Sequence, residues 1–291
     1  MTKLKEKPKR AARGGMGRIP LALLVMAALV MMAVLRQLRQ QPPADRSSVP
    51  PDTVTVDDGV NTVTITPHGD IPAATLSAED FTASEDWVLY SGPSRQGIDV
   101  SEFQGQIDWE QAADSGVEFA FLRLGYRGST EGGLYTDERF EENLAGAAGA
   151  GVSVGVYFFS QALDGEEAVR EAEFVLDVLN GRTLDLPVMF DWEPVDTEGA
   201  RTAGLGAQAV TECAAAFCGR IAETGLSAGV YFNRQQGYYV YDLSRLKDYV
   251  LWVSDPGVWP NFYYAVDVWQ YSFSGTVPGI GAPVDRNIWF D

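Results

Sequence analysis

The 291-residue sequence is poor in the side chains that enzymes most often use to bind metals or to act as nucleophiles. It has one histidine, His68, and two cysteines, Cys213 and Cys218. One imidazole and two thiols are too few ligands, at workable spacing, for a His-rich zinc site, and a single His excludes mechanisms that need two. Carboxylates must therefore carry out any acid/base chemistry, and neither a metal nor a cofactor is expected.

Basic residues are also scarce, with 22 Lys and Arg against 40 Asp and Glu and a net charge of −18. This balance argues against a nucleic-acid partner, because phosphate binding needs a clustered basic surface. Residues 1–46 hold ten basic and two acidic residues, so they carry +8 and leave −26 for residues 47–291. A net positive charge is therefore found only in the N-terminal segment, and the rest of the chain is acidic.

One uncharged apolar run, residues 19–35, lies inside this basic segment. Its seventeen residues are at the short end of the roughly 17–25 that span a bilayer. Seven basic residues precede it, so the positive-inside rule places the N-terminus in the cytoplasm and the rest of the chain outside. Because no clear small-residue cleavage site follows, we expect an uncleaved single-pass anchor in the cell membrane; a cleaved secretory signal and a buried core helix are the alternatives.

The remaining chain divides into a polar segment and a domain. Pro, Ser and Asp are frequent after the apolar run, and alternating apolar residues on both sides of Asp58-Gly59 predict a short hairpin. The predicted parts are a basic cytoplasmic tail at 1–18, a transmembrane anchor at 19–35, a linker with a possible short hairpin at 36–90 and a barrel domain at 91–291.

Eight short apolar runs in this domain can be interpreted as strands, with helical patterns between most of the first five. The pattern predicts an α/β fold, an irregular eight-stranded β/α barrel of the TIM-like kind with parallel strands, behind the N-terminal transmembrane helix. The expected strands are residues 97–100, 119–124, 152–159, 186–192, 227–232, 249–254, 265–271 and a short run near 284, and the expected helices are 137–150, 165–179 and 206–224.

Both cysteines fall in the last of these helices. Five residues correspond to about 500° of helical rotation, so the two side chains diverge and cannot form a disulfide without breaking the helix. We expect Cys213 and Cys218 to be small buried apolar residues.

Four acidic residues follow or end predicted strands: Asp99, Asp191, Glu193 and Asp285. Residues two apart on a strand point to the same side, so Asp191 and Glu193 project together from one face. Two adjacent carboxylates do not both ionise readily, and one is expected to hold a proton at neutral pH. A carboxylic acid beside a carboxylate is what a glycosidase needs to protonate a leaving oxygen.

Aromatic side chains recur near the same strand ends. Their faces can pack on the C–H faces of sugar rings, whereas side chains such as Gln270 can bond sugar hydroxyls. Packing of the barrel core and rim explains some of these residues equally well. The predicted substrate-binding residues are Tyr157, Tyr231, Trp252, Trp269 and Gln270.

Five motifs, in a fixed order along the predicted domain, resemble those of a known protein family. They are Gly97-Ile98-Asp99-Val100-Ser101 with Phe103-Gln104-Gly105 and Ile107-Asp108-Trp109, Phe190-Asp191-Trp192-Glu193-Pro194, Leu251-Trp252-Val253, Trp269-Gln270-Tyr271-Ser272 and Val284-Asp285-Arg286-Asn287. Together they resemble glycoside hydrolase family 25, the muramidases, which are lysozymes that cleave the β-1,4 bond between N-acetylmuramic acid and N-acetylglucosamine in peptidoglycan. The resemblance covers about residues 96–291.

The resemblance implies an acidic groove that binds peptidoglycan glycan strands. In it, Glu193 is the general acid/base, Asp191 positions the substrate N-acetyl group, and Asp99 and Asp285 complete the cluster. The chain departs from many members at Tyr157-Phe158-Phe159, where a His often follows the Tyr, and at Ser101-Glu102. Two alternatives remain, a chitinase-like β-1,4-N-acetylglucosaminidase, which would have a further Asp where Met189 stands, and a non-catalytic wall-binding module.

Overall fold

The structure is a computed structural model that describes residues 52–84 and 87–291. The predicted cytoplasmic tail and the predicted anchor at 19–35 lie outside the described residues. Among the residues that are described, no helix is both long enough and apolar enough to cross a membrane. The expected transmembrane helix is therefore not found in this part of the chain.

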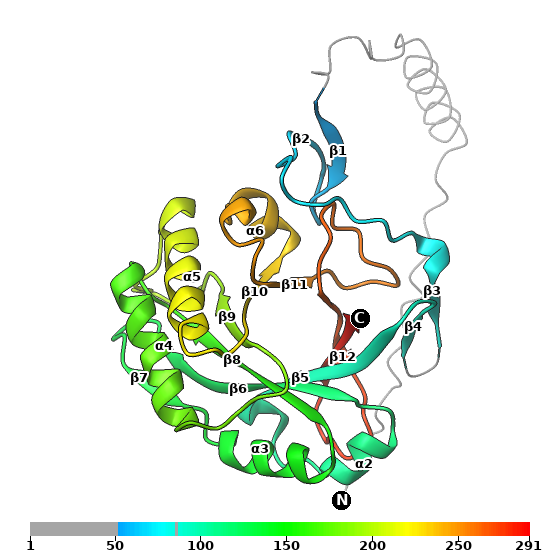
Figure 1. Cartoon of the computed structure of the whole chain (residues 1–291), viewed down its shortest axis with the longest axis vertical. Helices are drawn as coiled ribbons and strands as arrows, with labels where there is room; N and C mark the ends of the chain where they lie inside the picture. The colour runs from blue at the N-terminus through cyan, green and yellow to red at the C-terminus, as the bar shows by residue number, and fades with distance from the viewer. Residues whose placement is uncertain (1–51, 85–86) are drawn as a thin grey trace, which may run out of the picture. The chain divides into compact units, whose positions relative to one another are not determined.

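A closed barrel of eight strands forms the centre of the molecule (Figure 1). The strands are β5 (Ser94–Val100), β6 (Phe119–Arg127), β8 (Ser153–Ser160), β9 (Val188–Trp192), β10 (Ala228–Asn233), β11 (Val250–Ser254), β12 (Val268–Gly275) and β13 (Val284–Phe290). They follow each other around the barrel in chain order, and β5 pairs with both β6 and β13 to close it. A short strand, β7 (Leu134–Thr136), pairs antiparallel with the end of β6.

The prediction of a TIM-like β/α barrel is wrong, because the sheet is mixed and helices cover only part of it. Strands β5 to β12 of the barrel pair in parallel, but β13 is antiparallel to both β12 and β5. Residues 276–283 are too few for a parallel crossover, which needs a dozen or more, so the chain turns back on itself. In the described chain no α-helix joins β11 to β12 or β12 to β13. The regular alternation of parallel strand and helix is thus missing.

The α-helices that are present lie between the earlier strands: α2 (Trp109–Asp114), α3 (Phe140–Gly149), α4 (Gly165–Leu179), α5 (Ala207–Ala222) and α6 (Arg234–Tyr239). Helix α4 begins where the Asp164 side chain accepts a hydrogen bond from the Glu167 amide, and it ends at Asn180 in a left-handed conformation. Its apolar residues recur every three or four positions and are buried, which explains why this segment packs on the barrel.

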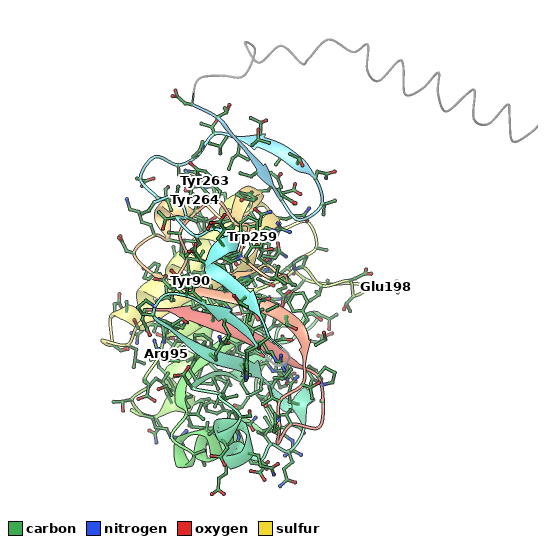
Figure 2. The ribbon with its side chains drawn as sticks, turned by 90° about the vertical axis from the view of Figure 1, so that its right-hand side faces the viewer. Tyr90, Arg95, Glu198, Trp259, Tyr263 and Tyr264 are labelled. Carbon is green, nitrogen blue, oxygen red and sulfur yellow. The ribbon has the colours of Figure 1, made fainter. Side chains whose placement is uncertain are left out.

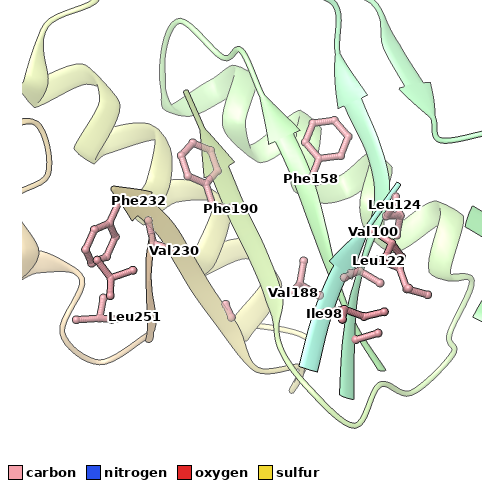
Figure 3. Packing of buried hydrophobic residues seen from close by; sticks show 14 of the residues in the cluster. Ile98, Val100, Leu122, Leu124, Phe158, Val188, Phe190, Val230, Phe232 and Leu251 are labelled. Atoms are coloured by element: carbon pink, nitrogen blue, oxygen red, sulfur yellow. The ribbon is translucent and has the colours of Figure 1, made fainter. Parts of the chain in front are cut away.

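The strands are apolar on both faces because one face meets the helices and the other fills the barrel. Phe158 and Phe190 point outward and lie 6.4 and 5.4 Å from the ring of Phe217 in α5. Figure 3 shows Phe158 and Phe190 among the buried residues of this outer layer. Inside the barrel, the rings of Phe121 and Trp252 stack 4.6 Å apart. The barrel is therefore packed, and a ligand can enter only at its ends.

The hairpin predicted around Asp58-Gly59 is present. Strands β1 (Val54–Asp57) and β2 (Thr62–Ile65) pair antiparallel, and β3 (Phe81–Ala83) and β4 (Val88–Tyr90) form a second such pair. Gly59 has a φ of +100° in the turn, where the Asp58 carboxylate accepts hydrogen bonds from two backbone amides.

This N-terminal segment is attached to the barrel. The Tyr239 hydroxyl donates to Asp58 at 2.7 Å, and the Ala74 amide donates to the Tyr263 carbonyl at 2.8 Å. Figure 2 shows Tyr263 and Tyr264 next to the place where the segment passes the barrel. Residues 52–84 and 87–90, which fall in the segment expected to be mainly a linker, therefore form strands and contact the barrel.

The two cysteines are both in α5, buried and free, as predicted. Burial raises the pKa of the Cys213 thiol to about 12, so it stays protonated and inert at neutral pH.

Candidate active site

A cavity of about 710 Å³ lies at the end of the barrel where the parallel strands finish. Its lining includes all four of the predicted catalytic carboxyl groups and also Tyr157. Asp99 lies near the end of β5, Asp191 near the end of β9, and Glu193 directly after β9. Because β13 runs in the opposite direction, its second residue, Asp285, lies at the same end and pairs across the sheet with Asp99. The reversed last strand thus completes the cluster.

Asp99 and Asp285 share one proton. The Oδ2 atom of Asp99 accepts hydrogen bonds from the side-chain amides of Gln270, at 2.9 Å, and Asn287, at 2.8 Å. Burial raises the pKa of Asp99, and these amides oppose that shift because they favour the charged form. Burial, followed by the charge on Asp99, raises the pKa of Asp285 to about 8. The two amides favour the charged form of Asp99, so Asp285 is the member of the pair that is favoured to hold the proton.

Two further side chains fix the orientation of these amides. The Tyr231 hydroxyl donates to Gln270 Oε1 at 2.8 Å, and the Trp252 indole nitrogen donates to Asn287 Oδ1 at 2.9 Å. Each carboxamide oxygen is occupied, so the NH₂ group of each side chain must face Asp99. Two buried chains of hydrogen bonds, through Gln270 and through Asn287, thus stabilise the charged form of Asp99.

Asp191 is buried without the partners that Asp99 has. Its Oδ1 atom has no hydrogen-bond partner among the described residues. Burial, then the charge on Glu193, raises the pKa of Asp191 well above its usual range, and burial, then the charge on Asp99, raises that of Glu193. The two carboxyls therefore titrate as a coupled pair, and both pKa values are shifted so that the protonated form is favoured.

The backbone around Glu193 is held by two glutamines. Gln161 Nε2 donates to the Glu193 carbonyl at 3.0 Å, and Gln236 Nε2 donates to the Trp192 carbonyl at 2.8 Å. The Thr202 hydroxyl donates to Gln161 Oε1 at 2.7 Å and so fixes that carboxamide. The segment that carries Glu193 is therefore held in place, although it lies beyond the end of its strand.

Arg123, on β6, also lines the cavity, and the sequence analysis did not identify it. It forms ion pairs with Asp137 at 2.8 Å and with Glu102 at 2.9 Å, and the exposed ring of Phe103 lies 4.8 Å from its guanidinium carbon. Its positive charge lowers the pKa of Asp191, against the larger effect of burial. The signal in the sequence was a single charged residue within the otherwise apolar run 119–124.

The structure separates the predicted substrate-binding residues. Tyr157 lines the cavity, whereas Tyr231, Trp252, Trp269 and Gln270 are buried and do not line it. Tyr231, Trp252 and Gln270 belong to the hydrogen-bond chains that end at Asp99. The indole nitrogen of Trp269 instead donates to the Asp255 carbonyl at 2.8 Å. Within residues 52–84 and 87–291, no three His, Cys, Asp or Glu side chains are grouped so that they could hold a metal ion.

Known proteins share this domain. The family model "Glycosyl hydrolases family 25" matches residues 98–280. The autolytic lysozyme of Clostridium acetobutylicum is 31% identical over 192 residues, which cover 65% of this chain and 54% of that protein. The chain thus spans about half the length of this relative.

Two solved structures have the same fold. A bacterial lysozyme from Streptomyces coelicolor superposes with a TM-score of 0.56 at 28% identity, covering 66% of this chain and 90% of the other. The modular autolysin LytC from Streptococcus pneumoniae, in complex with a synthetic peptidoglycan ligand, superposes with a TM-score of 0.60 at 23% identity. The match covers 68% of this chain and 47% of the other. With the family match over more than half of its length, the chain belongs to the glycosyl hydrolases of family 25.

Proposed function

We propose that this protein is a lysozyme that hydrolyses the β-1,4 bond between N-acetylmuramic acid and N-acetylglucosamine in peptidoglycan. Family membership, two similar proteins named lysozymes and a similar fold solved with a peptidoglycan ligand support the substrate class. The observation that carries the proposal is the cavity lined by Asp99, Asp191, Glu193 and Asp285. A glycosidase needs a protonated carboxyl and a charged one at the bond it cleaves, and this site supplies both.

Glu193 acts as the general acid and then as the base. It gives its proton to the glycosidic oxygen while the bond to the anomeric carbon breaks, and it later takes a proton from the water that attacks this carbon. Burial and then the nearby charge on Asp99 support this role, because both raise the pKa of Glu193 and so favour its acid form.

Asp191 holds the N-acetyl group of the substrate. Its Oδ1 atom is buried with no protein donor in the described chain, so an amide N–H of a bound sugar would supply the missing hydrogen bond. The two-residue spacing of Asp191 and Glu193 also predicts that both approach the sugar from one side, which suits neither of the two-sided carboxylate arrangements. We therefore propose that the substrate's own N-acetyl oxygen attacks the anomeric carbon, with net retention of configuration.

Replacing Glu193 by Gln tests the acid. Turnover of peptidoglycan should fall by about 100-fold or more, the usual contribution of general acid/base catalysis, while glycan binding stays measurable. Glu198 is the matched control: it lies exposed on the loop after β9 and projects away from the barrel (Figure 2), so Glu198→Gln should retain wild-type turnover. A Glu193→Gln enzyme with a third of wild-type activity would remove this role from Glu193.

NMR of the first products formed tests the stereochemistry. Retention gives the β-anomer first. An α-anomer would contradict assistance by the N-acetyl group and would assign the base to Asp99 or Asp285.

We also propose that the domain acts outside the cytoplasmic membrane, where peptidoglycan lies. The basic and then apolar N-terminal segment supports export. Protease added to intact cells should release a fragment with residues 96–291 while a tag before Lys3 remains protected. A protected domain would exclude export, and a mature chain starting between Leu35 and Ser47 would indicate a cleaved signal.

A further inference from the structure

A second pocket lies beside the catalytic cavity, at the same end of the barrel. It has a volume of about 280 Å³, and residues after β10, after β11 and on β12 line it together with the turn of the β1–β2 hairpin. We call it the hairpin pocket; the residues used below are Asp58, Val60, Asn233, Arg234, Asp255 and Phe273. The family match begins at residue 98, so the hairpin wall of this pocket lies outside the matched region.

The register of the strands places the hairpin pocket next to the catalytic carboxyls. Tyr231 of β10 pairs with Asp191 of β9, and Asn233 and Glu193 each follow two residues later, at the same end of these neighbouring strands. On the other side, Phe273 follows three residues after Gln270, which donates to Asp99. The hairpin pocket and the catalytic cavity therefore open at the same end of the barrel, at the ends of neighbouring strands.

The chemistry of the hairpin pocket suits an uncharged sugar. Two large apolar side chains line it and are open to solvent, Val60 with 72% and Phe273 with 53% of the residue exposed. Its charged groups are paired within the protein: Arg234 with Asp255 at 3.1 Å, and Asp58 with the Tyr239 hydroxyl at 2.7 Å. The volume is close to the lower limit of about 300 Å³ for small-molecule pockets. An apolar platform with paired charges favours a neutral ring over a charged peptide.

We propose that the hairpin pocket is an additional glycan subsite, which binds an N-acetylated sugar of the same strand beyond the one being cleaved, with Phe273 as the stacking platform. The inference rests on the proposed function and adds to it a preference for long glycan strands. Since an exposed pocket of this size contributes one sugar contact, the effect is on length preference and not on the chemical step.

The test compares a short and a long defined peptidoglycan glycan, a tetrasaccharide and an octasaccharide, with the full-length protein. We expect Phe273→Ala to lower the ratio of kcat/KM for long over short glycan by about fivefold, the effect of one lost ring contact. Val60→Asp should lower the same ratio, because the new charge would have to be desolvated on binding. Leu89→Ala, an apolar truncation at an exposed position of β4, is the matched control and should leave the ratio unchanged.

Calorimetric binding of the octasaccharide, measured with each of these changes in a Glu193→Gln background, separates the two proposals. If the wild-type protein cleaves neither glycan, the proposed function fails, and the binding data still test the pocket. Weaker binding of Phe273→Ala than of Leu89→Ala supports the subsite. Equal binding, or an unchanged length ratio in an active enzyme, overturns it.

Discussion

Two buried acids in this molecule have opposite surroundings. Glu171, on α4, is fully buried, and both of its oxygens are occupied: Arg127 donates to one at 2.6 Å and the Ser160 hydroxyl to the other at 2.6 Å. Asp191 is buried at the cavity and leaves one oxygen without a partner in the described chain. Burial raises the pKa of both, that of Glu171 to about 7. A raised pKa alone therefore does not identify a functional acid; Asp191 differs from Glu171 because it lines the cavity and has an oxygen without a partner in the described chain.

The largest expected difference between the two acids is in turnover. Asp191→Asn should lower kcat by about 100-fold or more, since it removes a charge that stabilises the transition state. Its free energy of unfolding should not fall, because a neutral amide removes the cost of burying a carboxylate at this position. Turnover and chemical denaturation of the same preparation test both statements. Activity within tenfold of wild type would contradict the assignment of Asp191.

Glu171→Gln should show the reverse pattern. It leaves the Arg127 guanidinium buried without its counter-charge, and breaking such a pair costs about 3 kcal/mol of unfolding free energy. Because Glu171 does not line the cavity, kcat per folded molecule should stay within a few-fold of wild type. A stable Glu171→Gln protein that has lost turnover would mean that the comparison is wrong.

The pH dependence of stability distinguishes Asp285 from ordinary surface acids. In the native state Asp285 keeps its proton up to about pH 8, whereas the unfolded chain releases it near pH 4. Between these values the native state binds more protons, so stability falls as the pH rises, by at most about 1.4 kcal/mol per pH unit. Denaturation at pH 5, 6, 7 and 8 should show a shallower decline for Asp285→Asn. Parallel curves for variant and wild type would argue against the shared proton.

The smallest expected effect is at the connection between Glu171 and the segment that carries Glu193. Ser160 bonds Glu171, and the next residue, Gln161, bonds the carbonyl of Glu193. Thr202→Val removes the hydroxyl that orients Gln161 and should cost about 1 kcal/mol of stability. If Gln161 positions Glu193, kcat should fall a few-fold while KM changes little. An unaltered kcat with the expected stability loss would leave Gln161 with a structural role only.

The sequence predicted the strands and the acids better than the architecture. Each of the eight apolar runs overlaps a barrel strand, because strands covered on both faces are continuously apolar. The direction of β13 was missed, since periodicity does not record direction, and the short connection after β12 was the only signal. The expectation that site residues lie at strand ends still identified Asp285 as a residue of the cavity, although β13 runs in the opposite direction to the other strands.

The polar support of the site could not be predicted from spacing. Gln161, Gln236 and Asn287 act through contacts with residues 32 to 188 positions away, which only the folded chain defines. The aromatic residues Trp252 and Trp269 looked like sugar platforms because exposure cannot be read from the residue type. The exposed ring at the cavity is instead Phe103, within one of the quoted motifs.

Mass spectrometry of the soluble products formed from purified peptidoglycan tests the central claim most directly. Cleavage by Glu193 and Asp191 at the proposed bond predicts fragments with muramic acid at the reducing end, formed by the wild-type protein and absent with Glu193→Gln. Fragments with glucosamine at the reducing end, or no soluble products from the folded wild-type protein, would contradict it.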